Sequence, residues 1–176
     1  MAANIISAVF DSQSEAERAA ADLRRAGVPE SAFSVVARHG DNATTASGDG
    51  VVTDDSHTNL LRGILGGGAL GTGLAIAALA IPGVGPLVAA GAIAAAAIPG
   101  AAAIGAVAGA AVGTLNETLK DHGVDDSDLD YYNGHIEKGG VFLSVDTSMG
   151  GVDGERIRDI LHSNGGHNAS RSRVAM

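Results

Sequence analysis

The residues from Gly63 to Asn116 form one continuous stretch without any Asp, Glu, Lys, Arg or His. Gly, Ala, Ile, Leu and Val make up nearly all of it, and three of the chain's four prolines lie within it. Such a stretch exposes a large apolar surface unless something covers it. It therefore has to pack closely within a bilayer, within the chain's own core, or against another subunit.

Small residues recur at every fourth position in two parts of this stretch. A spacing of four places residues on one face of a helix, and small residues there let two helices approach closely. Each glycine inside a helix costs about 0.8–1.0 kcal/mol relative to alanine, so close packing or a bilayer has to offset this cost. The spacing predicts helix packing through seven positions: Gly63, Gly67, Gly71, Ala101, Gly105, Gly109 and Gly113.

The tetrapeptide Ala-Ile-Pro-Gly occurs twice, at 80–83 and at 97–100. Proline cannot continue a helix smoothly, and glycine favours a turn. We therefore predict a hairpin of three helical pieces, over 60–81, 86–97 and 100–120. The turns of this hairpin are predicted at Pro82, Gly83, Pro86, Pro99 and Gly100.

The first predicted helix is long enough to cross a bilayer of about 30 Å at a rise of about 1.5 Å per residue. The third helix is only weakly hydrophobic and would insert only together with the first. Arg62 and Lys120 flank the stretch, and basic flanks would place both ends on the cytoplasmic side of a membrane. The alternative is a hairpin buried against the chain's own domain or another subunit, and the sequence leaves both open.

The chain before this stretch has the pattern of a strand, a helix and a strand. Residues 4–10 alternate in a way that predicts a strand buried on both faces and hence central in its sheet. Ser12 and Glu15 fit a capping box at the start of a helix, and Gly27 is expected to end that helix. Residues 32–38 predict the second strand.

The chain after the stretch predicts a helix, a strand and a second helix. Apolar residues have helical spacing over 129–136, a strongly β-prone strand covers 141–146, and a helix covers 153–163. A short edge strand is predicted over 173–176. The order is β-α-β, a long insertion and β-α-(β), which is that of a ferredoxin-like α+β sandwich opened between its second and third strands.

This order divides the chain into four parts. The linker is polar, rich in Gly, Ser, Thr and Asp, and lacks periodicity, so it is expected to be flexible. The parts are the first β-α-β half at 1–38, the linker at 39–58, the Gly/Ala-rich apolar helical hairpin at 59–120, and the second half at 121–176.

Composition argues against several classes of function. The chain has no cysteine, which excludes disulfides, thiol catalysis and cysteine-bound metals. A net charge of −9 and an aromatic content of 3% argue against binding nucleic acid. The first five residues contain no basic group ahead of an apolar run, so a secretory signal is not expected. We expect a protein of the cytoplasm or of the cytoplasmic face of the membrane, and not a secreted one.

No sequence motif predicts catalysis. The six histidines are scattered without an H-E-x-x-H motif, and no G-x-S-x-G occurs. Acidic residues from Asp126 to Glu137 fall on several ligand positions of a calcium loop, but Tyr131 stands where that loop needs glycine. Helical spacing in the same residues favours a helix. We therefore predict no catalytic, cofactor-binding or metal-binding residues, and the protein is not expected to be an enzyme.

Several short segments also carry a resemblance to a known family. They are residues 8–11, 15–18, 23–27 and 34–38, then Ile81-Pro82-Gly83-Val84-Gly85-Pro86, and finally 131–132 and 139–141. In this order they resemble the bacterial general-stress, heat-induced-stress domain family, and the resemblance covers nearly the whole chain. It implies an association with stress response, and it implies no catalytic activity, cofactor or active-site residue.

We therefore expect a non-enzymatic, stress-associated protein that self-associates and anchors to the cytoplasmic membrane face through its glycine-zipper hairpin. The alternative is a soluble homo-oligomer that buries the hairpin at subunit interfaces and acts as an assembly or partner-binding module. Expected partners are further copies of the chain and, in the first case, membrane lipid. A small-molecule-binding regulatory domain rests on fold analogy alone.

Overall fold

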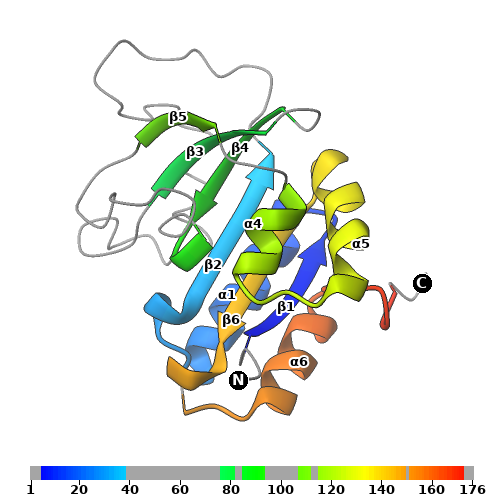
Figure 1. Ribbon diagram of the computed structural model, residues 1–176. Coiled ribbons are helices and arrows are strands. Elements are labelled where there is room, and N and C mark those ends of the chain that lie inside the picture. The colour runs from blue at the N-terminus through cyan, green and yellow to red at the C-terminus, as the bar shows by residue number, and fades with distance from the viewer. Residues whose placement is uncertain are drawn as a thin grey trace.

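The computed structural model describes a mixed helix and strand protein built on one six-stranded sheet (Figure 1). The described residues are 5–38, 76–81, 85–93, 107–111, 115–149 and 151–172. The strands are β1 (Ile5–Phe10), β2 (Phe33–Arg38), β3 (Ile76–Ile81), β4 (Gly85–Ala90), β5 (Val107–Ala111) and β6 (Val141–Asp146). Their order in the sheet is β1-β6-β2-β4-β3-β5, and all neighbours pair antiparallel except β3 and β5. The architecture fits the predicted α+β class.

Helices cover both faces of the part of the sheet formed by β1, β6 and β2 (Figure 1). On one face, α1 (Gln13–Arg25) and α6 (Gly154–Ser163) pack over a buried cluster that includes Phe10, Leu143 and Val35. On the other face, α4 (Leu115–Asp121) and α5 (Asp126–Glu137) pack over a second cluster. Two short 3-10 helices, η1 (Glu30–Ala32) and η2 (Thr147–Met149), complete the described elements.

Helix α1 begins and ends where the sequence predicts. The Ser12 hydroxyl accepts a hydrogen bond from the Glu15 amide at 3.4 Å, which satisfies one of the free N–H groups of the first turn. Gly27 follows the helix with φ +103°, a left-handed conformation that glycine adopts without steric cost. The apolar face of the helix is buried as expected, through Ala16, Ala19, Ala20 and Leu23.

The position of β1 differs from the prediction. Both faces of β1 are buried as expected, with Ile6, Ala8 and Phe10 in one cluster and Val9 in the other. However, β1 stands at the end of the strand order, and among the described residues its outer side carries a single antiparallel bridge, from Val9 to His167. Burial on both faces results from helices on both sides of the sheet, so it does not require a strand to be central.

The predicted helical hairpin is wrong in its described parts. Residues 76–81, 85–90 and 107–111 form strands. The described residues of the predicted hairpin are helical only at 92–93 and in α4, at the end of the piece predicted over 100–120. A continuous helix over 60–81, which carried the argument for crossing a bilayer, is therefore excluded. A short apolar run bounded by Gly and Pro fits a strand buried on both faces as well as it fits a buried helix, and periodicity alone does not separate the two.

The strands of this region extend the sheet from β2. Strand β4 pairs with β2 from Arg38↔Leu87 to Val35↔Ala90, and β3 pairs with β4 along its whole length. Pro86 was predicted to be a turn residue but lies within β4, opposite Ala80. Its missing N–H is tolerated there because the pairing with β2 starts only at Leu87.

Gly91 follows β4 and lies very close to the backbone of β2. It has φ +85°, and the next amide, that of Ala92, donates to the buried Ser34 hydroxyl at 3.0 Å. A methyl group at Gly91 would lie 2.1 Å from the Phe33 carbonyl oxygen. The chain therefore needs glycine at this position, where it leaves the sheet.

Two further predictions lie outside the described residues. They are the flexible linker at 39–58 and the edge strand over 173–176. Among the helices that the structure describes, none combines the length and the apolar character that crossing a bilayer requires.

Gly134 is an ordinary helical position in α5, with open space where a side chain would start. Because glycine costs about 0.8–1.0 kcal/mol relative to alanine inside a helix, Gly134→Ala is expected to stabilise the protein by about that amount. Urea unfolding would measure the gain. An unchanged or reduced free energy of unfolding would contradict the helix at this position.

Candidate functional site

The structure describes two of the predicted helix-packing and turn residues, and neither lies in a helix. Gly109 lies in β5 and Pro86 in β4. The other predicted packing and turn residues lie outside the described part of the chain: Gly63, Gly67, Gly71, Pro82, Gly83, Pro99, Gly100, Ala101, Gly105 and Gly113.

Strands β3, β4 and β5, which we call the sheet extension, consist entirely of apolar residues and glycine. Their sequences are IAALAI, GPLVAA and VAGAA. A strand with one face in water alternates apolar and polar residues, whereas these strands have the composition of strands covered on both faces. The described helices pack over β1, β6 and β2, and β4 joins the two clusters beneath them, whereas β3 and β5 lie beyond (Figure 1). Leu87, Ala89 and Ile93 are fully buried at the junction with the helical part.

A row of three serines crosses the other part of the sheet beneath α4 and α5. Ser7 of β1, Ser144 of β6 and Ser34 of β2 lie opposite one another in the strand register. Each hydroxyl has a partner from a different element. Tyr132 contacts the first at 3.2 Å, the His122 ring contacts the second at 3.0 Å, and the Ala92 amide donates to the third at 3.0 Å. The row therefore ties three covering segments to the sheet.

Tyr132 is the largest fully buried side chain of this face. Its hydroxyl donates to the Ser7 carbonyl oxygen at 3.0 Å, and its ring lies edge-on to Phe142 at 5.1 Å. Burial raises the pKa of Tyr132 far above its usual value, although the hydrogen bond with Ser7 opposes this in part. Burial likewise lowers the pKa of His122, against the opposing charge of Asp146.

The raised pKa of Tyr132 predicts a loss of stability in alkali. The unfolded chain releases this proton near pH 10, whereas the folded chain retains it, so the stabilisation is present below about pH 10 and is lost as the pH rises beyond it. The chain has two tyrosines and no tryptophan, so phenolate absorbance reports them cleanly. We expect Tyr132→Phe to remove the later of two titration steps. A single step near pH 10 in the folded protein would contradict the burial of Tyr132.

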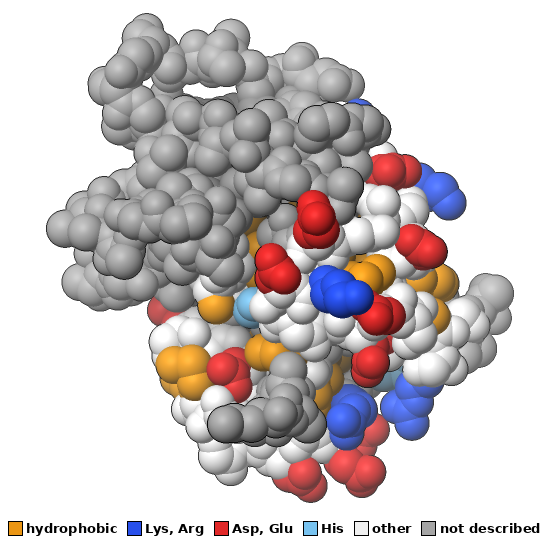
Figure 2. Space-filling model, viewed as in Figure 1, with side chains coloured by type: hydrophobic (Ala, Val, Ile, Leu, Met, Phe, Trp, Pro, Cys, Tyr) orange, Lys and Arg blue, Asp and Glu red, His pale blue; other side chains and the backbone are white. Residues whose placement is uncertain are grey.

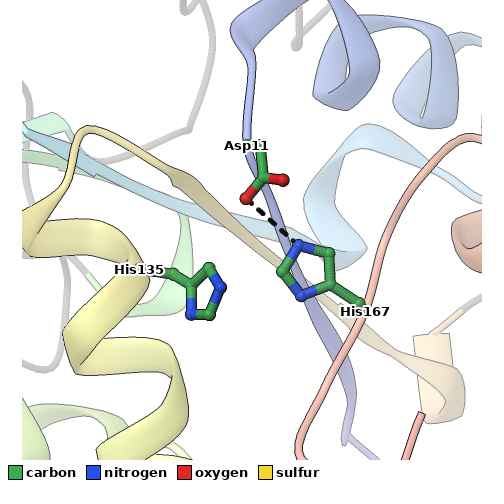
Figure 3. Close-up of side chains that lie close together, drawn as sticks. All are labelled: Asp11, His135 and His167. Atoms are coloured by element: carbon green, nitrogen blue, oxygen red, sulfur yellow. Dashed lines mark hydrogen bonds and ion pairs between the residues drawn. The ribbon is translucent and has the colours of Figure 1, made fainter. Parts of the chain in front are cut away.

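A second cluster of polar side chains lies where β1 ends (Figure 3). Asp11 follows β1, His135 lies in the last turn of α5, and His167 lies in the segment after α6. One ligand atom from each of the three, a carboxylate oxygen or a ring nitrogen, lies within 4.8 Å of the other two. In the described part of the chain, this is the group of side chains that could together hold a metal ion.

The backbone places these three residues together. The His167 amide donates to the Val9 carbonyl at 3.0 Å, and the Val9 amide donates to the His167 carbonyl at 2.9 Å. This pairing holds the tail against the free side of β1, two residues before Asp11. Helix α5 packs on the same strand and brings its last turn to the same place.

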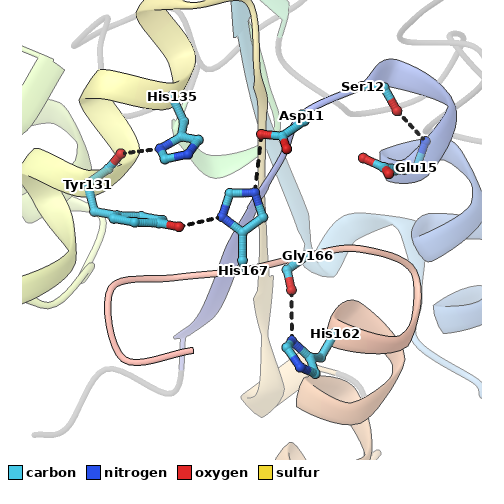
Figure 4. Close-up of polar contacts among 8 residues, drawn as sticks. All are labelled: Asp11, Ser12, Glu15, Tyr131, His135, His162, Gly166 and His167. Carbon is cyan, nitrogen blue, oxygen red and sulfur yellow. Dashed lines mark hydrogen bonds and ion pairs between the residues drawn. The ribbon is translucent and has the colours of Figure 1, made fainter. Parts of the chain in front are cut away.

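Hydrogen bonds orient the side chains of the cluster (Figure 4). His167 Nε2 lies 3.3 Å from Asp11 Oδ1, and its Nδ1 lies 2.8 Å from the Tyr131 hydroxyl. His135 Nδ1 donates to the Tyr131 carbonyl oxygen at 3.0 Å. Burial raises the pKa of Tyr131, and the carboxylates of Asp11 and Asp128 raise it further.

The side chains of the cluster differ in how far they are exposed to water. His167 is 2% exposed, whereas the Asp11 side chain is 45% exposed. The imidazoles of His135 and His167 lie close, with ring centres 4.8 Å apart. The site is therefore anchored on the inside by His167 and open to water at Asp11.

Sequence reasoning missed this cluster. Its members lie far apart in the sequence, and no spacing connects positions 11, 135 and 167. The acidic stretch considered as a calcium loop is helix α5, as the helical spacing indicates, and the loop geometry is therefore excluded. Within that stretch, Asp126 pairs with Lys120 at 2.9 Å, and Asp128 accepts from the Ala169 amide at 2.9 Å.

The described part of the chain is thus a mixed helix and strand domain with an apolar sheet extension and a His-His-Asp cluster at the end of β1. The chain matches no protein-family model, and no curated protein or solved structure is found to be similar to it. The resemblance to bacterial general-stress proteins stays a prediction from the sequence.

Proposed function

We propose that this chain is a non-enzymatic, stress-associated protein that self-associates through its apolar central segment. The observation that carries the proposal is the sheet extension. Its strands contain no polar side chain, and the residues from Gly63 to Asn116 contain no charge. Strands of this composition need cover on both faces, and a monomer rarely leaves a large contiguous apolar surface uncovered. The occupant that best matches such a surface is the same segment of a second copy.

The strand pairing favours assembly in water over anchoring in a membrane. The membrane proposal needed a long apolar helix ending at Ile81, and the last six residues of that segment pair as strand β3 instead. Strands at the end of a sheet associate readily, because their free backbone groups and apolar faces accept a further strand or a second sheet. We therefore propose that the apolar segment is buried at an interface between subunits.

We also propose that the helix-covered part is a ferredoxin-like core. The order β1-β6-β2 supports this, because β1 and β2 both pair antiparallel to β6 and therefore run parallel to each other. Helices α1 and α6 pack on the same face of these strands, as the two helices of a ferredoxin-like fold do. In this arrangement the core presents the sheet extension, and the extension makes the intersubunit contacts.

Fractionation of the native, untagged protein from its cells tests the proposal. The pellet is extracted with carbonate and then with detergent. Recovery in the soluble fraction, as an assembly larger than the 17.3 kDa chain, is expected. Release by detergent alone would contradict assembly in water and favour the membrane anchor.

The stress association rests on the resemblance and has its own test. The amount of the protein is measured by quantitative immunoblot before and after heat shock, with a housekeeping protein as control. A rise after heat shock is expected. An unchanged amount under heat and under other common stresses would contradict this part of the proposal.

A further inference from the structure

We infer that Asp11, His135 and His167 form a binding site for a divalent transition-metal ion, with Zn²⁺ as the ion that fits the ligand set. Two imidazoles and one carboxylate are ligands that zinc accepts in proteins, and three protein ligands leave a position open to water. The site does not depend on self-association, so either proposal can fail without the other.

The distance between two of the ligands already suits a metal. Zinc binds nitrogen and oxygen at about 2.0–2.2 Å, so adjacent ligand atoms of a tetrahedral site lie about 3.4 Å apart. His167 Nε2 and Asp11 Oδ1 are 3.3 Å apart. The ligand atoms of all three residues lie within 4.8 Å of one another. The ligand nitrogen of His135 therefore has to approach the other two by at most about 1.4 Å to reach the tetrahedral spacing. His135 is half-buried at the end of α5, where a side-chain rotation can supply that movement.

The hydrogen bonds hold His135 in the form that a metal needs, and they give His167 a partner for the proton that it has to move. His135 donates its Nδ1 proton to the Tyr131 carbonyl oxygen, which leaves the Nε2 lone pair free to bind an ion. The other histidine, His167, has its Nδ1 beside the Tyr131 hydroxyl at 2.8 Å. When an ion replaces the proton on Nε2 of His167, that proton moves to Nδ1 and is donated to the tyrosine oxygen. A neighbouring group that binds the second ring nitrogen is typical of metal-binding histidines.

Charge and burial also suit a cation. The Asp11 carboxylate lies at the cluster, and the Asp128 carboxylate accepts a hydrogen bond from the Ala169 amide, two residues after His167. The chain as a whole has a net charge of −9, and Asp and Glu side chains are spread over the face of the molecule that carries α4 and α5 (Figure 2). His167 is anchored by two backbone hydrogen bonds to Val9, so one ligand is already rigid before binding. Rigid ligands lose little freedom when an ion binds, which favours affinity.

The test uses the untagged full-length protein after treatment with a chelator. Zn²⁺ is titrated calorimetrically, and Co²⁺ serves as a spectroscopic probe of the same site. One ion per chain is expected, with a rise in melting temperature and a visible Co²⁺ spectrum that Zn²⁺ abolishes. The absence of both the heat of binding and the spectrum would overturn the inference.

Two substitutions and one control variant test which residues bind the ion. His135→Gln and Asp11→Asn each remove one ligand from a side chain that is not deeply buried, and each is expected to weaken Zn²⁺ binding at least about a hundredfold. His162→Gln is the matched control, because His162 lies close by in α6 but bonds the Gly166 carbonyl and stands outside the cluster. Circular dichroism verifies that all three variants fold. Equal affinity in His135→Gln and the wild type would overturn the inference, since the ion would then bind elsewhere.

Discussion

Replacing Gly91 with alanine is expected to destabilise the protein by about 2–5 kcal/mol. The residue has φ +85°, and a left-handed conformation costs a residue with a side chain about 1–2 kcal/mol. The added methyl carbon would also lie 2.1 Å from the Phe33 carbonyl oxygen and 3.0 Å from Ser34 Cα. Both contacts are with the backbone of β2, so the strands have to shift, at a further cost of about 1–3 kcal/mol. Urea unfolding of the variant and the wild type measures the difference.

Gly139→Ala is the matched control for this substitution. Gly139 has φ +95°, but nothing lies within 4 Å of the added methyl carbon, so only the conformational cost of about 1–2 kcal/mol is expected. The difference between the two variants isolates the close approach of β4 to β2. The helix that the sequence predicts over 86–97 implies the opposite sign, a gain of about 0.8–1.0 kcal/mol for Gly91→Ala. A stabilised variant would therefore contradict the strand assignment.

Replacing Phe142 with alanine is expected to cost about 3–5 kcal/mol of stability. Phe142 is fully buried in β6, with Val9 and Val36 opposite it on the two neighbouring strands. Its ring also lies edge-on to Tyr132 of α5 at 5.1 Å. Removing it leaves a cavity between the sheet and α5, which surrounding side chains fill only in part. The free energy of unfolding from urea denaturation checks this value.

Met149→Ala is the control for a loss of apolar volume without a cavity. Met149 lies in η2 and is 52% exposed, so a change within about 0.5 kcal/mol is expected. If Phe142→Ala costs no more than the Met149 variant, the second core cluster is not packed as described.

The two ends of the chain could be predicted because their signals agree with one another. In β1, alternation placed Ile6, Ala8 and Phe10 on one face, and they lie together in one buried cluster. At α1, the N-cap at Ser12 indicates where the helix begins, and Gly27 independently indicates where it ends. Where local preference and pattern indicate the same element, a single sequence is sufficient to assign it.

The central segment could not be predicted in the same way. It consists of small and apolar residues throughout, so it lacks the polar positions that distinguish a period of two from a period of 3.6. The glycine spacing predicts a helix-packing face, yet Gly109 lies in β5. What determines β4 is the free edge of β2, to which it adds a ladder of backbone hydrogen bonds, and an available edge is a property of the folded sheet.

The metal-binding cluster is also a property of the fold. Its residues come from the end of β1, the last turn of α5 and the tail after α6. Only the antiparallel contact of His167 with Val9, together with the packing of α5, brings them to one place. Scattered histidines without a spacing motif therefore could not indicate the site from the sequence alone.

The central claim is that the apolar segment joins copies of the chain, and the mass of the purified, untagged protein tests it most directly. Sedimentation velocity in detergent-free buffer over a range of concentrations is expected to show an assembly larger than the 17.3 kDa chain, even in the most dilute sample. A folded, monodisperse monomer throughout that range would contradict the claim.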